Sequence, residues 1–307
     1  MSILVDEGTN LLVQGITGKE GRTHTRRSLE AGVHVVAGVT PGKGGEEVCG
    51  VPVYDHVAQA LAAHPSINAT MILVPPKAVL SAGMEALDAG LKLVVIITEF
   101  VPAHDALKIL RKAKAKGATV IGPNTIGVIS PGRSKIGIMP DYIYKRGHIG
   151  IISRSGTMTH EVASNLSFAG YGQSSCLGIG GDMIVGMSHT DGLELFRKDE
   201  DTACVILLGE IGGVSEENAA EYIRQTQYPK PVLAYIAGAQ APAGKKMGHA
   251  GAIVSGGRGS AASKIKALRD ANISVAESVG HLLDLIKEED MRMGGFLQTV
   301  PPIQDMD

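Results

Sequence analysis

The chain has 307 residues, of which 44% are hydrophobic and 20% charged, and its formal net charge is −2. This length allows two domains with buried cores, and the interleaved, nearly balanced charges favour neither nucleic-acid binding nor a polybasic membrane anchor. No apolar run approaches the roughly 20 residues that span a bilayer, and the start of the chain does not resemble a secretory signal.

Cysteine usage argues against an extracellular or zinc-binding protein. The three cysteines, Cys49, Cys176 and Cys204, are an odd number without a Cys-x-x-Cys spacing, so we expect neither a disulfide framework nor a metal site. The expected location is therefore the cytoplasm, or an organelle matrix if the protein is eukaryotic. Forty glycines and no tryptophan suggest many tight strand-to-helix turns, as in an α/β protein.

In the first half of the chain, strand-length apolar runs alternate with helical periods, which is typical of βαβ units around a parallel sheet. The expected strands are at residues 11–16, 34–39, 70–74, 93–97 and 119–121. Helical periods occupy residues 77–89 and 106–116.

The same alternation restarts near residue 148, after a stretch in which Pro and Gly interrupt both periods. Expected strands are at 148–153, 174–178, 203–208 and 231–236, and helices at 157–169, 191–198, 216–225 and 260–271. We expect one domain at 1–125, a connecting segment at 126–147 and a second domain at 148–307. The last part of that second domain, after Glu288, is expected to be an extended tail.

A glycine-rich turn follows the first expected strand and opens a helix, where βαβ units bind phosphate on helix-terminal N–H groups. Its glycines, Gly15, Gly18 and Gly21, lack the G-x-G-x-x-G spacing of dinucleotide sites. The second strand is followed by Lys43 instead of an acidic residue. A cation there suits a phosphorylated ribose, so coenzyme A fits better than NAD. The alternative is a packing turn with an exposed lysine.

Two further strand ends carry candidate groups. Ser153, Ser155 and Gly156 run from a strand into a helix, so they form a candidate phosphate site, although such serines are often N-caps. Glu210 ends a strongly apolar strand at the edge where open α/β sheets build their sites. It is a candidate to hydrogen-bond an imidazole and set its tautomer, or else a solvated loop residue.

The candidate imidazole is that of His249, which glycine and alanine flank in Gly248-His249-Ala250-Gly251. Lys245, Lys246 and Arg258 lie nearby in the sequence, so this histidine is suited to carry a phosphoryl group. An incidental histidine in a glycine-rich turn has the same pattern. Residues 238–246 do not form a P-loop, because the spacing is one residue too long and Ser/Thr is missing. A nucleotide would therefore bind to another chain.

Eight loops, in order along the chain, resemble those of the succinyl-CoA synthetase α-subunit family. They are GITGKEG (15–21), VTPGKGG (39–45), ITE (97–99), GPN (122–124), ISRSGT (152–157), GIGGD (178–182), GEIGG (209–213) and GHAGAI (248–253). The resemblance implies an α/β fold with an N-terminal Rossmann-like CoA-binding domain and a C-terminal flavodoxin-like parallel domain. It also implies a heterodimer or heterotetramer with an ATP-grasp β subunit that binds ATP or GTP with Mg²⁺.

Residue roles follow from the same resemblance. His249 corresponds to the phosphohistidine and Glu210 to the carboxylate that orients it. The acid substrate passes through an acyl phosphate, and the histidine carries the phosphoryl group between separated sites. The residues that correspond to the coenzyme A site are Thr17, Gly18, Lys19, Glu20, Lys43, Ile97, Thr98 and Glu99.

The chain departs from the family pattern where the small carboxylic acid would bind. Thr125-Ile126 follows Asn124 in place of Cys-Pro, and His160 replaces a tyrosine before Glu161. We expect Asn124, Thr125 and His160 to meet the acid, with His189 nearby. Succinate is the default acid, but Thr125-Ile126 resembles ATP-citrate lyase, so citrate, malate or a similar acid stays open. A non-catalytic CoA-binding regulatory module is a further alternative, and the presence of both His249 and Glu210 counts against it.

Overall fold

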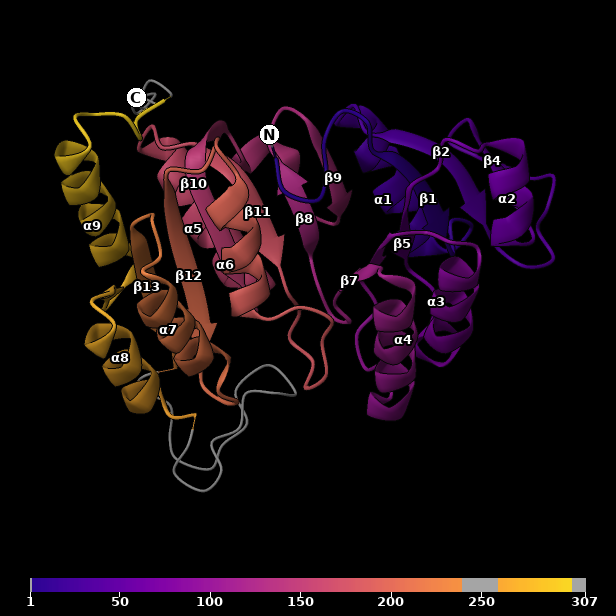
Figure 1. Cartoon of the computed structure of the whole chain (residues 1–307). Coiled ribbons are helices and arrows are strands. Elements are labelled where there is room, and N and C mark those ends of the chain that lie inside the picture. The colour runs from indigo at the N-terminus through magenta and orange to yellow at the C-terminus, as the bar shows by residue number, and fades with distance from the viewer. Residues whose placement is uncertain (1, 239–258, 300–307) are drawn as a thin grey trace.

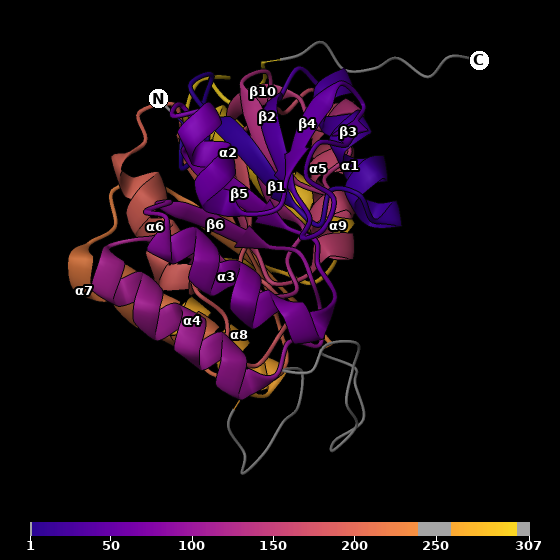
Figure 2. The same cartoon turned by 90° about the vertical axis from the view of Figure 1, so that its right-hand side faces the viewer.

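The computed structural model describes residues 2–238 and 259–299. Two α/β units lie side by side, the first half of the chain in indigo and magenta and the second half in pink to yellow (Figure 1). Figure 2 shows the first unit from its outer side, with α3 and α4 packed side by side. Within the described ranges, each unit is built around a seven-stranded sheet.

The first sheet has the order β3-β4-β2-β1-β5-β6-β7, and its strands are parallel except for the antiparallel pair β3–β4. Because β2 and β5 lie on opposite sides of β1, the loops after β1 and β5 diverge and leave a crevice at their carboxyl ends. The strands are β1 (Asn10–Gln14), β2 (His34–Val39), β3 (Glu47–Val48), β4 (Val51–Tyr54), β5 (Ala69–Ile72), β6 (Leu93–Ile96) and β7 (Thr119–Ile121). The helices are α1 (Lys19–Glu30), α2 (Val57–Ala63), the 3₁₀ turn η1 (Pro76–Ala78), α3 (Val79–Asp88) and α4 (Ala103–Lys116).

The second sheet has the order β14-β13-β12-β10-β11-β8-β9. Its five strands from β14 to β11 are parallel and have the flavodoxin order, in which the crevice lies between β10 and β12. The strands are β8 (Gly127–Ser130), β9 (Ser134–Gly137), β10 (Arg146–Ser153), β11 (Gln173–Gly178), β12 (Cys204–Glu210), β13 (Val232–Ala237) and β14 (Ser274–Ala276). The helices are η2 (Asp141–Ile143), α5 (Gly156–Phe168), α6 (His189–Lys198), α7 (Ser215–Thr226), α8 (Ala261–Asp270) and α9 (Val279–Arg292).

The predicted α/β organisation is confirmed, and each predicted strand and helix has a counterpart within a few residues. The expected connecting segment differs in detail, because it contains the antiparallel hairpin β8–β9, which pairs with β11. Periodicity did not predict these strands, because glycine stands at the start of β8 and at the end of β9. The two strands pack closely there, since a Cβ on Gly127 would lie 1.9 Å from the Ile136 carbonyl oxygen. The expected extended tail also differs, since α9 continues past Glu288 to Arg292.

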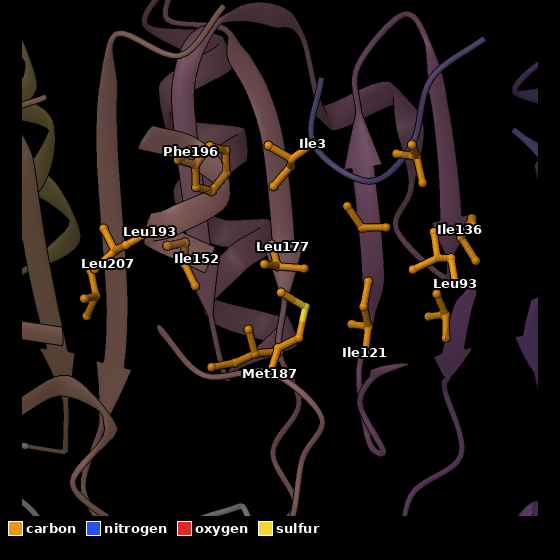
Figure 3. Close-up of a cluster of buried hydrophobic side chains, with 14 of the residues drawn as sticks. Ile3, Leu93, Ile121, Ile136, Ile152, Leu177, Met187, Leu193, Phe196 and Leu207 are labelled. Atoms are coloured by element: carbon orange, nitrogen blue, oxygen red, sulfur yellow. The ribbon is translucent and has the colours of Figure 1, made fainter. Parts of the chain in front are cut away.

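One hydrophobic cluster runs from the first sheet into the second. Leu93 and Ile121, on β6 and β7, belong to the same buried cluster as Ile152 and Leu207, on β10 and β12 (Figure 3). Because interiors pack at near-crystalline density, this shared core holds the two sheets in a fixed relation. No helix within the described ranges is long and apolar enough to cross a membrane.

Candidate active site

A large cleft lies between the two units at the carboxyl ends of their strands, with a volume of about 1160 Å³. The loops that bound the β1/β5 crevice line it, and so do the residues that follow β10. From the first unit it is lined by Gly15, Thr17–Gly21, His24, Thr40, Pro41, Leu73–Pro76, Ala78 and Ile97–Phe100. From the second half of the chain it is lined by Asn124–Ile126, Ile138, Arg154, Gly156, Thr157 and His160.

The three glycines of the first turn have separate roles. Gly15 has a φ of 85°, a left-handed conformation that glycine adopts without strain. Gly18 is the N-cap of α1 and offers no side-chain acceptor to the first-turn N–H groups, which leaves them for an anion. Gly21 packs so closely that a Cβ there would lie 2.2 Å from the Gly15 carbonyl oxygen. The predicted Thr17, Gly18, Lys19 and Glu20 all line the cleft.

Lys43 lies beside this site without lining the cleft. Its ammonium group is half exposed and lies 2.9 Å from the Glu46 carboxylate. The Gly44 N–H donates to Asp55 Oδ1 at 2.9 Å, and this hydrogen bond is the main cause of the lowered pKa of the Asp55 carboxyl group. Because Asp55 already occupies that N–H group, we expect anion recognition by this loop to depend on the Lys43 side chain.

The residues predicted after β6 line the cleft beside the loop that follows β5. Thr98 Oγ1 donates to the Val74 carbonyl oxygen at 2.7 Å, which ties the loops after β5 and β6 together. Ile97, Thr98 and Glu99 all line the cleft. The Asn124 N–H donates to the Thr98 carbonyl oxygen at 3.0 Å, so the same loop also holds the start of the second half of the chain.

The second wall begins at the N-terminus of α5. Ser155 is the N-cap, and its hydroxyl accepts from the Met158 N–H at 3.4 Å. The Ser153 hydroxyl accepts from the Ser155 N–H and donates to the Ser155 carbonyl oxygen, both at 3.0 Å. Gly156 lines the cleft, whereas Ser153 and Ser155 do not. The two serines therefore shape the turn, and the helix N-terminus at Gly156 is the part that faces the cleft.

Arg154 joins the cleft to Glu210. Its Nη2 donates to the Asp182 carbonyl oxygen at 2.9 Å, and its Nε lies 3.7 Å from Glu210 Oε1. Both side chains are at least nine-tenths buried. Arg154 and Glu210 stand at the ends of β10 and β12, between which the flavodoxin order places its crevice.

A buried ion pair holds the turn that follows Glu210. Glu216 Oε1 accepts from the Glu210 N–H at 3.1 Å, while the fully buried Lys264 pairs with the fully buried Glu216. Lys264 Nζ also donates to the Gly213 carbonyl oxygen at 3.2 Å. His249 lies outside the described residues.

The described residues on either side of 239–258 both lie against this turn. The Gly212 N–H donates to the Gly259 carbonyl oxygen at 2.8 Å. A Cβ on Gly238 would lie 3.1 Å from the Ile211 side chain. Gly238 and Gly259 therefore both lie next to the loop that carries Glu210.

The three residues predicted to meet the acid all line the cleft. Asn124 Nδ2 donates to Asp182 Oδ1 at 3.0 Å. The Thr125 hydroxyl donates to the Gly178 carbonyl oxygen and accepts from the Gly127 N–H, so its hydrogen-bonding groups are already engaged within the protein. His160 Nδ1 lies 2.7 Å from the Tyr144 hydroxyl.

The structure differs from the sequence prediction at His189, and it adds one histidine to the cleft. His189 is fully buried, with Nδ1 2.9 Å from the Ser215 hydroxyl and Nε2 3.3 Å from the Leu208 carbonyl oxygen. It does not line the cleft, so it packs inside the second unit. His24, which the sequence analysis did not single out, lines the cleft instead. Its spacing from Gly21 places both residues on the buried face of α1, a signal that was present in the sequence.

Comparisons with known proteins agree with this geometry. A CoA-binding domain family matches residues 6–100, and a CoA-ligase family matches residues 152–274. The succinate–CoA ligase [ADP-forming] subunit alpha 2 of Archaeoglobus fulgidus is 53% identical over 94% of this chain and 99% of its own length. An ADP-forming sulfoacetate–CoA ligase subunit of Acholeplasma sp is 46% identical over 92% of this chain and 98% of its own length.

Among solved structures, ATP citrate lyase from Methanothrix soehngenii, in complex with citrate and coenzyme A, superposes with a TM-score of 0.85 at 24% identity. The match covers 99% of this chain but only 52% of that one, so this chain spans about half of the lyase. This likeness describes the fold alone. The two matched families and the close relatives over almost the full length show that the chain belongs to the succinate–CoA ligase α-subunit family, with a CoA-binding domain followed by a CoA-ligase domain.

Proposed function

We propose that this chain is the α subunit of a nucleoside-diphosphate-forming acid–CoA ligase, with succinate as the default acid. An ATP-grasp β subunit supplies the site for ATP or GTP with Mg²⁺, and the two chains form a heterodimer or heterotetramer. Cys176 and Cys204 are buried free thiols, which suits a reducing compartment, either the cytoplasm or an organelle matrix.

The observation that carries the proposal is one cleft lined by two helix N-termini and by Arg154, which forms a buried ion pair with Glu210. The start of α1 at Gly18 and the start of α5 at Gly156 both line it, and each offers N–H groups and a positive helix end to an anion. Arg154 connects the cleft to Glu210. A reaction that brings together phosphate, a carboxylic acid and a thiol ligand needs such adjacent anion sites.

Coenzyme A fits the first wall. Pockets for drug-sized ligands measure about 300–1,000 Å³, and the cleft of about 1160 Å³ has room for a longer molecule. The turn at Thr17–Glu20 would hold phosphates on its N–H groups, with Ile97, Thr98 and Glu99 on the other side. Lys43, exposed at the rim, would pair with the 3′-phosphate.

The second wall serves the acid and phosphate. A carboxylate is a poor electrophile, so joining it to a thiol requires phosphate as the leaving group. The N-terminus of α5, with Gly156 at its first turn and Ser153 and Ser155 shaping it, would hold that phosphate. Glu210 would accept a hydrogen bond from the His249 imidazole and fix its tautomer. The attachment of Gly238 and Gly259 beside the Glu210 loop supports pairing Glu210 with the histidine between them in the sequence.

The first test is phosphorylation of His249. The purified α–β complex is incubated with ³²P-labelled nucleoside triphosphate, and the labelled chain is treated with acid and with base. We expect acid-labile, base-stable phosphate on the wild type and none on His249→Asn, which also loses thioester formation. His281→Asn, on the start of α9, is the matched control. Equal labelling of the His249→Asn complex would contradict the assignment.

A second test separates Glu210 from coenzyme A binding. Glu210→Gln should slow phosphoryl transfer to and from His249, measured by rapid quench, because a neutral amide stabilises a charged imidazole less well. Coenzyme A affinity should stay within about twofold, since the carboxylate does not line the cleft. Unchanged transfer rates would reduce Glu210 to a partner of Arg154 within the turn.

Two observations leave the identity of the acid substrate to be tested. His160 places an imidazole in the cleft wall, and a sulfoacetate–CoA ligase subunit is among the close relatives. Buried polar groups that match a substrate discriminate strongly against acids that lack the partner. Comparing kcat/KM for succinate, malate, citrate and sulfoacetate on the wild type and on His160→Tyr/Thr125→Cys tests this. A substituted acid ranking above succinate would identify another di- or tricarboxylate, or a sulfonate, as the substrate.

A further inference from the structure

His160 has a buried neighbour with no predicted role. Tyr144 directly follows η2 and is 4% exposed, and His160 lies in the second turn of α5. The Tyr144 hydroxyl lies 2.7 Å from His160 Nδ1. The two rings meet edge to face, with centroids 6.1 Å apart and planes at 77°. The pair connects the segment before β10 to the wall of the cleft.

The direction of this hydrogen bond follows from the donors and acceptors present. Burial raises the pKa of the Tyr144 phenol, so the group stays protonated. Its O–H needs an acceptor, and within residues 2–238 and 259–299 the acceptor is His160 Nδ1. If Nδ1 carried the hydrogen instead, the phenol hydrogen would be buried without an acceptor, which costs free energy. Nδ1 therefore accepts, and the ring hydrogen is on Nε2.

His160 is neutral in this arrangement, because burial lowers the pKa of its imidazole. The ring lines the cleft, and in the described part of the chain Nε2 has no hydrogen-bond partner. The cleft thus has an uncharged N–H donor on the wall that we assign to the acid. A donor of this kind pairs with a carboxylate, hydroxyl or sulfonate oxygen and has nothing to pair with on an alkyl chain.

We propose that Tyr144 is a specificity-determining positioning residue, which holds His160 as an Nε2–H donor so that the cleft selects acids with a second oxygen-bearing group. This inference rests on the proposed acid–CoA ligase function. Tyr144 acts through His160 and does not line the cleft itself. It keeps the imidazole oriented and keeps its hydrogen on the nitrogen away from the phenol.

The test compares two acids of equal chain length, succinate and butanoate, which differ in the distal carboxylate. Thioester formation is measured with the α–β complex for wild type, Tyr144→Phe, His160→Phe and the double variant. Tyr144→Phe should lower the succinate-to-butanoate ratio of kcat/KM by about fivefold, the value of one hydrogen bond of about 1 kcal/mol. The change should lie in the KM for succinate, with kcat for butanoate nearly unchanged.

The double variant separates positioning from packing. If Tyr144 acts through His160, the ratio for the double variant equals that for His160→Phe alone. Two results would overturn the proposal and make Tyr144 a packing residue. In the first, Tyr144→Phe lowers the succinate-to-butanoate ratio of kcat/KM as much in the His160→Phe background as in the wild type. In the second, Tyr144→Phe lowers kcat/KM equally for both acids. Coenzyme A affinity of each complex verifies that the cleft is folded.

Failure of the proposed function has a different outcome. A wild-type complex that forms no thioester with any acid would contradict the ligase assignment, whereas an active complex with an unchanged ratio in Tyr144→Phe contradicts only this inference.

Discussion

The two walls of the cleft differ in the groups that form them, which are mainly backbone in the first wall and side chains in the second. The first wall relies on backbone, namely a turn with three glycines and an uncapped helix N-terminus, and the exposed Lys43 lies beside it. The second relies on side chains that hold one another, as Arg154 does with Glu210 and Tyr144 with His160. Backbone N–H groups recognise phosphate whatever is attached to it, whereas oriented side chains discriminate between acids. The difference suits a common thiol ligand on one side and a selected acid on the other.

The largest effect should come from the buried ion pair behind the second wall. Lys264→Met leaves the Glu216 carboxylate buried without its cation, and we expect the free energy of unfolding to fall by about 3–5 kcal/mol. Urea denaturation of the chain measures this loss. Adding Glu216→Gln should recover part of it, because the amide is neutral and still accepts from the Glu210 N–H.

The first unit offers a matched comparison for that pair. Lys112 and Asp88 form an ion pair that is partly exposed to solvent, so Lys112→Met should cost much less. If Lys112→Met and Lys264→Met lower the free energy of unfolding by similar amounts, burial of the ion pair does not distinguish the second unit from the first.

In the first wall, we expect the damaging substitutions to be those that displace backbone atoms. Gly21→Ala would bring a Cβ within 2.2 Å of the Gly15 carbonyl oxygen, and overpacking of this kind costs about 1–3 kcal/mol. Because the displaced atoms belong to the turn that we propose binds phosphate, we expect coenzyme A affinity, measured by calorimetry, to fall about tenfold or more. Gly18→Ala is the control, since its Cβ would lie 3.4 Å from the same oxygen. Equal losses for the two variants would refute a specific role for close packing at Gly21.

These contrasts also explain what could be predicted from the sequence. The glycine turn, the strands and the main helices depend on residues near one another in the chain, so spacing and periodicity were sufficient. The Arg154–Glu210 contact depends on the strand order, which places β10 beside β12, and the Tyr144–His160 hydrogen bond joins α5 to the segment before β10. Neither the strand order nor a contact between distant segments leaves a periodic signal in the sequence. His189 was misplaced for the same reason, since only the packing of α6 on α7 shows that its ring points inward.

A smaller effect tests the charge at the rim of the first wall. Lys43→Ala should weaken coenzyme A binding by about 1–3 kcal/mol, the value of a charge-assisted contact to phosphate. Binding of 3′-dephospho-coenzyme A, which lacks that phosphate, should change little. If both ligands lose equally, Lys43 contributes general positive charge and not recognition of the 3′-phosphate.

The smallest expected effect is a pH dependence of stability in the second wall. Burial lowers the pKa of His160 below its ordinary value of 6.5. Above that value His160 is neutral in both the folded and unfolded chain, so it adds no pH dependence. As the pH falls below about 6.5, the unfolded chain takes up a proton that the folded chain resists, and stability declines until the lower folded pKa is reached. Thermal unfolding of wild type and His160→Gln, each referred to its own value at pH 8, isolates this contribution. The variant should lose less between pH 6.5 and pH 5, and an identical decline would mean that the imidazole titrates freely and is not held neutral against Tyr144.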